Sequence, residues 1–108
     1  MKLLLNSLSH DYPDKKISFL IGFLADKEWQ TMTDMVINYK NIKNIYIMDI
    51  DYYRNLPSSS ISKYLSLKHN RSSTSIKNIS DAAKNENILC VCGSLYLIGQ
   101  VKKEFNQK

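Results

Sequence analysis

Short apolar runs alternate with longer amphipathic stretches along this chain. Three of the runs have the length of strands: "ISFLIGF" at 17–23, "NIYIMDI" at 44–50 and "ILCVC" at 88–92. They are nearly continuous and lack a regular polar alternation, which is typical of strands buried on both faces of a parallel sheet. We therefore predict mutually parallel strands at 17–22, 45–49 and 88–92.

The amphipathic stretches predict helices. In "LADKEWQTMTDMVINYK", Trp29, Met32, Val36 and Tyr39 follow one another at spacings of three or four, which is one stripe of a helix. Asp26 is the candidate N-cap. A stripe of this kind indicates contact with the core and not a cofactor site.

The rest of the chain predicts five further elements. These are a helix over 3–8, a helix from Pro57 to about 68, a short strand over 72–76, a helix through 81–87 capped by Ser75 or Ser80, and a helix over 95–106 with the stripe Leu97, Val101 and Phe105. Strands and helices alternate, so the order predicts an α/β fold: a Rossmann-like three-layer domain with a mostly parallel sheet and right-handed crossovers. We expect residues 1–108 to form a single domain.

Composition narrows the function classes. Of 108 residues, 44% are hydrophobic and 23% are charged, with a net charge of +5. The lysines are scattered among acidic residues, which favours a solvated basic surface over a nucleic-acid site. The apolar part of "MKLLLNSLSH" is shorter than that of a signal peptide, and no stretch approaches a membrane span. We expect a cytoplasmic protein, or one of an organelle matrix, with neither a nucleic-acid nor a membrane partner.

The two cysteines do not predict a metal site. Cys90 and Cys92 form a C-x-C pair inside an apolar run, while His10 and His69 lie in unrelated contexts. A zinc site needs further soft ligands at suitable spacings, and a bridge between strand neighbours two apart would be strained. We interpret both cysteines as small buried hydrophobes in a reducing compartment.

Ligands of such folds bind at the carboxyl ends of the strands. The loops of interest are therefore 22–27, 49–60 and 93–96. Gly93 permits a close approach to the backbone, and Ser94 stands where a helix begins. The hydroxyl and the helix N-terminus could hold a carboxylate or phosphate oxygen, or the serine could simply cap its own helix. The residues alone favour the cap.

The other two loops carry charge. Asp26 and Lys27 could place a charge over the strand ends, or belong to an exposed helix start. Asp49, Asp51 and Arg54 could contribute to a magnesium or acid–base site, but solvated loop charge is the preferred interpretation. No G-K-[ST] occurs, and nothing resembles a nucleophile beside a base, so we assign no catalytic residue and no triphosphate cradle.

Three segments resemble the carboxy-terminal domain of folylpolyglutamate synthase and dihydrofolate synthase, within the Mur ligase superfamily. "FLIGFLADKEWQTMTDMV" is similar to the family's "G-x-x-x-DKD" segment, and "ILCVCGSLYLIGQV" to its closing "V-x-x-GS-[LF]-[YH]-x-x-G/A-x-V" segment. "LPSSSISKYL" lies where the family has a Pro-Arg turn and a short helix. The resemblance covers nearly the whole chain.

The resemblance implies an ATP-dependent amide ligase of folate biosynthesis. ATP phosphorylates the carboxylate of folate or dihydropteroate, and the amino group of L-glutamate attacks the acyl phosphate. An amino-terminal P-loop domain binds ATP and Mg²⁺, and the Rossmann-like domain helps to hold glutamate and the nucleotide. By this resemblance Ser94 lies on the glutamate side, Asp26 and Lys27 lie near the cleft, and Tyr96 occupies a position usually held by an aromatic residue or histidine.

The chain departs from the family in three ways. The D-x-A-H-N-P motif and the P-loop domain are absent, and Pro57 is followed by Ser58 where the family has arginine. We expect residues 1–108 to be a truncated glutamate-ligase domain that binds no ATP or Mg²⁺ alone and does not catalyse ligation. The alternatives are a stand-alone Rossmann-like binding module and a degenerate piece that only packs against a partner.

Overall fold

The sheet lies at the centre of the computed structural model, which describes residues 1–25 and 28–106. It is four-stranded and all-parallel, in the order β3-β2-β1-β4. The strands are β1 (Ile17–Gly22), β2 (Ile42–Met48), β3 (Thr74–Ile76) and β4 (Leu89–Gly93). The three predicted strong strands are thus mutually parallel, and the predicted short strand is the one at the far edge.

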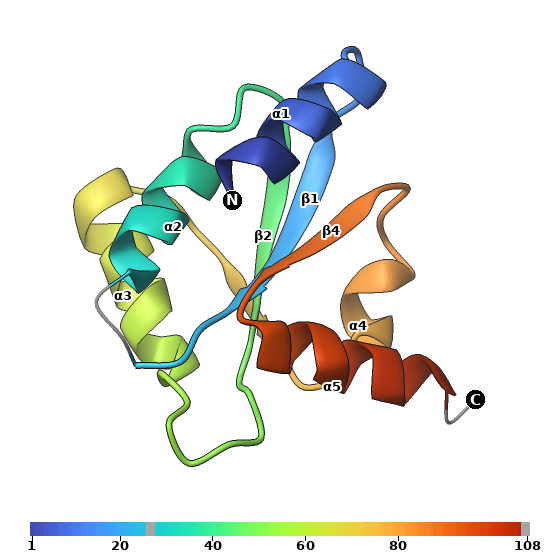
Figure 1. The fold of residues 1–108 in the computed structure, drawn as a ribbon. Coiled ribbons are helices and arrows are strands. Elements are labelled where there is room, and N and C mark those ends of the chain that lie inside the picture. Colours follow the sequence, from blue (N-terminus) through green and yellow to red (C-terminus); the bar gives the residue numbers. More distant parts are fainter. Residues whose placement is uncertain (26–27, 107–108) are drawn as a thin grey trace.

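Helices cover both faces of the sheet (Figure 1). One layer consists of α1 (Lys2–Asp11), α2 (Trp29–Ile37) and α3 (Ser58–His69), and the other of α4 (Ser80–Ala83) and α5 (Leu95–Asn106). The predicted Rossmann-like three-layer α/β fold is confirmed. Among the described residues, no helix is both long and apolar enough to cross a membrane.

Strand β1 is buried along its whole length. Its side chains alternate between the two helix layers, because successive residues of a strand point to opposite faces. Phe19 and Ile21 belong to the core beneath α1, α2 and α3, and Leu20 belongs to the core beneath α4 and α5. The continuous apolar run at 17–23 predicted a strand buried on both faces, and β1 is buried on both faces.

The predicted apolar stripe of α2 packs against the core, and that of α5 does so in part. In α2, Val36 is buried and Trp29 and Met32 are half-buried against the same core, as predicted. The N-cap predicted at Asp26 lies outside the described residues. In α5, the prediction was wrong for Phe105, which is 51% exposed. The end of that helix reaches past the sheet (Figure 1), so its last turn has less core to cover.

The helix predicted through 81–87 is shorter than expected. It ends at Ala83, and neither serine caps it: Ser75 lies in β3, and Ser80 is the first helical residue. The N–H of Ile79 is instead bound by the carboxylate of Glu104, at 2.9 Å. The chain leaves the helix early, and the segment that follows carries Glu86 into contact with side chains of β1 and β2.

The direction of winding changes at β1. The chain adds β2 and β3 on one side of β1 and then returns to place β4 on the other. The segments after β1 and β4 therefore lead to helices on opposite faces of the sheet (Figure 1). Such a switch point is where ligand crevices form in open α/β sheets.

Two glycines meet at this switch point. Gly22 and Gly93 are register partners, and the N–H of Ser94 donates to the carbonyl oxygen of Gly22 at 3.0 Å. Gly93 has a φ of 120°, and a Cβ there would lie 2.4 Å from the same oxygen. The close approach that the sequence predicted for Gly93 is confirmed, and its partner is the end of β1.

We expect Gly93→Ala to lower the free energy of unfolding by about 2–4 kcal/mol, because it adds backbone strain and a clash at once. Gly99→Ala is the matched control, since a Cβ at Gly99 in α5 meets no atom within 4 Å. The control should gain about 0.5–1 kcal/mol from helix propensity. Urea unfolding of the two variants measures both values, and equal stabilities would contradict the role given to Gly93.

Candidate functional site

The turn from β4 into α5 brings one hydroxyl group to the switch point. The Oγ atom of Ser94 accepts the N–H of Tyr96 at 3.1 Å, while its backbone carbonyl accepts the N–H groups of Leu97 and Ile98. Ser94 therefore caps α5. Because the hydroxyl accepts this bond, its own hydrogen is still available for donation to an anion beside the positive end of the helix dipole.

The loop after β2 uses its first carboxylate structurally. The carboxylate of Asp49 accepts the N–H of Ser58 at 2.8 Å and the side-chain amide of Asn55 at 3.1 Å. Asp49 is exposed, as expected for a solvated loop charge, and its carboxylate also binds the first turn of α3. Asp51 is held differently, because its N–H donates to the side chain of Gln100 in α5 at 2.7 Å.

The carboxylate of Asp49 is bound to the start of α3, whereas Asp51 contacts α5 through its backbone N–H. In residues 1–25 and 28–106, no group of three His, Cys, Asp or Glu side chains could hold a metal ion. The backbone of Arg54 accepts the N–H of Ala25 at 2.8 Å, so this loop lies against the segment after β1. Asp26 and Lys27, which the resemblance assigns to the cleft, lie outside the described residues.

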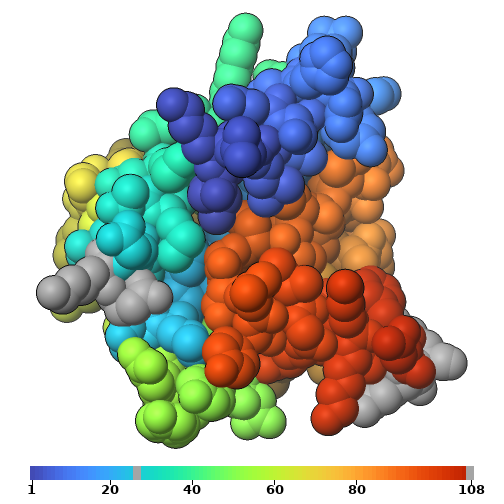
Figure 2. Space-filling model, in the orientation of Figure 1, coloured from blue at the N-terminus to red at the C-terminus, as the bar shows by residue number. Residues whose placement is uncertain are grey.

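Tyrosine side chains gather beside Ser94. The rings of Tyr52 and Tyr96 stack at a centroid distance of 4.5 Å and an interplanar angle of 16°, and Tyr53 lies 4.8 Å from Tyr52. Tyr96 is 52% exposed. Figure 2 shows the loop of residues 50–57 next to the start of α5 on this face. The sequence placed Tyr96 at the site but gave no sign of its stacking partner.

This carboxyl-edge site offers binding groups without a catalytic pair. A serine hydroxyl and a helix N-terminus suit a carboxylate or phosphate oxygen. No described side chain near Ser94 forms a nucleophile–base pair with it. The arrangement is consistent with holding a substrate whose chemistry is supplied by other residues.

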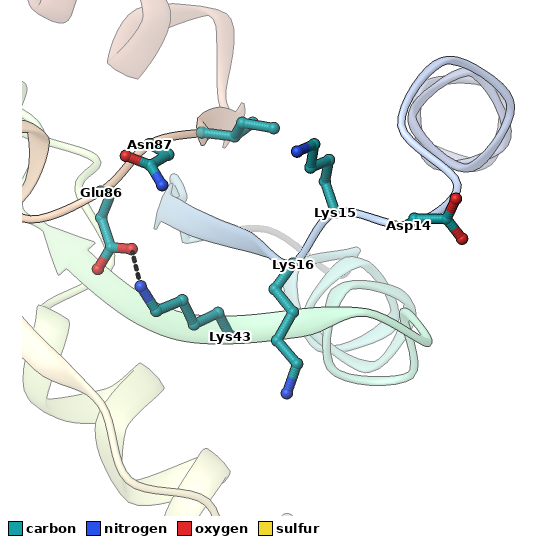
Figure 3. A pocket seen from close by; sticks show the side chains of 7 residues that line it. Asp14, Lys15, Lys16, Lys43, Glu86 and Asn87 are labelled. Atoms are coloured by element: carbon teal, nitrogen blue, oxygen red, sulfur yellow. Dashed lines mark ion pairs between the residues drawn. The ribbon is translucent and has the colours of Figure 1, made fainter.

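A cavity of about 480 Å³ lies at the opposite, amino-terminal edge of the sheet, where Lys43 reaches Glu86 (Figure 3). The Glu86 side chain is 2% exposed. Its Oε1 atom accepts the hydroxyl of Ser18 at 2.7 Å, and its Oε2 atom accepts the hydroxyl of Tyr46 at 2.6 Å and the amide of Asn44 at 2.8 Å. Glu86 therefore ties the start of β4 to β1 and β2.

The hydrogen bonds of Glu86 control its charge. Burial by itself would raise the pKa of this carboxyl group, but the bonds from Tyr46, Ser18, Asn44 and Lys43 outweigh burial and lower its pKa from 4.5 to about 2. A fully partnered carboxylate of this kind stabilises the fold and leaves little capacity for a ligand. Sequence reasoning missed it, although Ser18, a polar residue inside an apolar run, was a usable signal.

A second cluster joins α2 to α3. The carboxylate of Asp34 accepts the hydroxyl of Tyr64 at 2.7 Å, lies 2.6 Å from Nε2 of His69 and pairs with Lys68 at 3.4 Å. Burial opposes ionisation, but these partners outweigh it and lower the pKa of Asp34. The cluster was not predicted, because Asp34 lies 30 to 35 residues from its three partners and only the packing of the helices brings them together.

Comparison with known proteins supports the fold. The crystal structure of folylpolyglutamate synthase from Thermotoga maritima matches 97% of this chain with a TM-score of 0.76 and 23% sequence identity. The chain spans 25% of the length of that synthase. No family model and no curated protein matches the sequence. At this identity the likeness shows a shared fold. The matched region is one part of the larger synthase.

We expect Glu86→Gln to lower the free energy of unfolding by about 3 kcal/mol at neutral pH. The folded-state pKa is depressed, so the stabilisation by Glu86 is present above about pH 4.5 and is lost as the pH falls through about 2. The difference between parent and variant should therefore shrink over this range. Asp14→Asn, at the rim of the same cavity, is the matched control and should change neither stability nor its pH dependence.

Urea unfolding at a series of pH values provides the measurement. A parent–variant difference that stays constant from pH 7 to about pH 2 would show that the Glu86 charge does not stabilise the fold.

Proposed function

We propose that this chain is the carboxy-terminal, glutamate-ligase domain of an ATP-dependent ligase similar to folylpolyglutamate synthase. The observation that carries the proposal is the fold match to a quarter of such a synthase over 97% of this chain. The Gly93–Ser94 turn supports it, because it lies at the switch point where this type of sheet binds ligands.

In this proposal, L-glutamate binds beside the start of α5. The Ser94 hydroxyl accepts the N–H of Tyr96 and donates its own hydrogen to a glutamate carboxylate. Asp26, Lys27 and Tyr96 complete the glutamate side by resemblance to the family. The acceptor is folate or dihydropteroate, activated as an acyl phosphate before the amino group of glutamate attacks it.

The nucleotide belongs to another part of the ligase. The described residues include neither a phosphate-binding loop nor a cluster of three metal ligands, so they do not fit ATP and Mg²⁺. The amino-terminal P-loop domain of the parent ligase would hold both. The role of this domain is to bind glutamate and to close over the cleft.

The isolated chain should show no ligase chemistry. Incubated with ATP, Mg²⁺, L-glutamate and a reduced folate, it should release no phosphate above background, because positioning of the triphosphate supplies most of the catalysis in phosphoryl transfer. A coupled phosphate assay measures this. Glutamate-dependent phosphate release by the purified chain would contradict the proposal that another domain binds ATP and Mg²⁺.

Ser94 variants test the glutamate site directly. In a chimera that joins residues 1–108 to the remainder of the Thermotoga maritima synthase, Ser94→Ala should raise the glutamate KM about 10- to 150-fold. The KM for ATP should change much less. Steady-state kinetics with varied glutamate and varied ATP provides the comparison.

Ser94→Gly is the matched control for the cap. Glycine loses only a few tenths of a kcal/mol as an N-cap, whereas alanine costs about 0.5–2 kcal/mol. If both variants weaken glutamate use alike while only alanine destabilises the fold, the hydroxyl contacts the substrate. Unchanged glutamate kinetics in both variants would show that Ser94 acts only as a helix cap and would contradict its assignment as a glutamate contact.

A further inference from the structure

The cavity at the amino-terminal edge of the sheet lies between three segments of the chain. Its walls are residues 14–16 before β1, Lys43 in β2 and residues 86–88 before β4. Its volume of about 480 Å³ is within the range of small-molecule sites, which is about 300–1,000 Å³. It lies at the edge of the sheet opposite Ser94, so a ligand here would not contact the carboxyl-edge site.

The buried carboxylate of Glu86 has no capacity left for a cation. Hydrogen bonds from Ser18, Tyr46 and Asn44 reach its two oxygens, and Lys43 pairs with it at 3.3 Å. A carboxylate has about four acceptor positions, and four donors occupy them here. Because Lys43 balances its negative charge, Glu86 neither binds a cation nor strongly repels an anion.

Lys43 is held in place at both ends. Its ammonium group pairs with Glu86, and its backbone carbonyl oxygen accepts the guanidinium of Arg71. An ammonium group carries three N–H donors, and a single carboxylate oxygen uses one of them. The other two donors of Lys43 are therefore available to a ligand, in a side chain that the protein has already oriented.

Lys15 and Asn87 add further donors to the same cavity. Figure 3 shows the Lys15 side chain extending toward the segment of Asn87 and Ile88, whereas Asp14 points away. Within the part of the chain that the structure describes, neither the Lys15 ammonium nor the Asn87 side-chain amide has a hydrogen-bond or ion-pair partner. The ammonium offers three N–H groups and the amide two, against one amide oxygen. Donors thus outnumber acceptors in this cavity.

This excess of donors selects an oxyanion. Two ammonium groups, those of Lys15 and Lys43, face the cavity with one carboxylate, so the local charge is positive. The acceptors of a carboxylate lie in one plane, whereas the oxygens of a phosphate point in several directions and suit donors on different walls. The cavity is larger than a phosphate group, and the side chain of Ile88 and the lysine stems leave an apolar lining for a small organic part.

We propose that this cavity binds a phosphate group, either free or as a small phosphomonoester. Lys15, Lys43 and Asn87 donate hydrogen bonds to its oxygens, and the organic part of an ester lies against Ile88. Glu86 contributes by orienting Lys43 and does not touch the ligand. The site rests on residues at the amino-terminal edge and is independent of the proposed ligase function.

Titration of the complete 108-residue chain, followed by NMR at constant ionic strength, tests the site. The probes are inorganic phosphate and glycerol 3-phosphate, and L-glutamate is the control whose negative charges are planar carboxylates. We expect a dissociation constant on the order of 1 mM for phosphate, with shifts of the Asn87 side-chain amide signals and of the Lys15 and Lys43 backbone N–H signals. Tighter binding of glycerol 3-phosphate would identify an ester as the ligand, and equal binding would identify free phosphate.

Adjacent lysines provide a matched pair of variants. Lys15→Gln should weaken phosphate binding about 5- to 20-fold, as expected for one charge-assisted hydrogen bond at an exposed position. Lys16→Gln removes the same charge from the next residue, whose ammonium points away from Glu86 and Asn87 (Figure 3), and should bind phosphate as the parent does. Lys15→Arg keeps the charge and should retain binding. Urea unfolding without phosphate should give the same midpoint for all three variants and the parent.

Three outcomes would overturn the proposal. Equal weakening by Lys15→Gln and Lys16→Gln would show that phosphate responds only to the general positive charge of the surface. Binding of L-glutamate as tight as that of phosphate, with the same shifts, would contradict the selection of a tetrahedral anion. Absence of any shift at Asn87 up to about 10 mM phosphate would show that the cavity does not bind it. None of these outcomes depends on ligase activity or on Ser94, so failure of the phosphate site and failure of the glutamate site are distinguishable.

Discussion

The complete burial of β1 is the constraint on which the rest of this structure depends. Its side chains contact both helix layers, and its two edges are paired with β2 and β4. A polar side chain in such a strand costs about 1–3 kcal/mol if it lacks a partner. Ser18 is that side chain, and it bonds both Glu86 and the N–H of Asn44. The need to satisfy one buried hydroxyl thus links β1, β2 and the segment before β4 at the amino-terminal edge.

The same strand sets the geometry at the carboxyl-terminal edge. Because Gly93 lacks a Cβ, β4 can pair with β1 up to the last residue, and Ser94 can bond the carbonyl oxygen of Gly22. Helix α5 therefore begins directly at the switch point. A side chain at Gly93 would force the two strands apart and move the helix start away from the switch point.

Most of the helices and strands could be predicted from local sequence patterns, but few of the side-chain contacts between them could. Continuous apolar runs identified the strands, because burial on both faces requires several consecutive apolar residues. The partners of Glu86 and Asp34 lie tens of residues away, so no local pattern reveals them. The Gly93–Ser94 turn was predictable, since a glycine and a capping residue follow a strand there. The stack of Tyr52 on Tyr96 was not, because it depends on how the β2 loop lies against α5.

Within the first turn of α5, Tyr96 makes a polar contact with its backbone and an aromatic contact with its side chain. The backbone N–H of Tyr96 is bound to the Ser94 hydroxyl, whereas its side chain is engaged with Tyr52. Replacing the ring therefore leaves the cap intact, and replacing the hydroxyl leaves the stack intact. An anion beside Ser94 would therefore leave the stack of Tyr52 on Tyr96 undisturbed. The two contacts fit within a single helical turn because the backbone and the side chain of Tyr96 bind different partners.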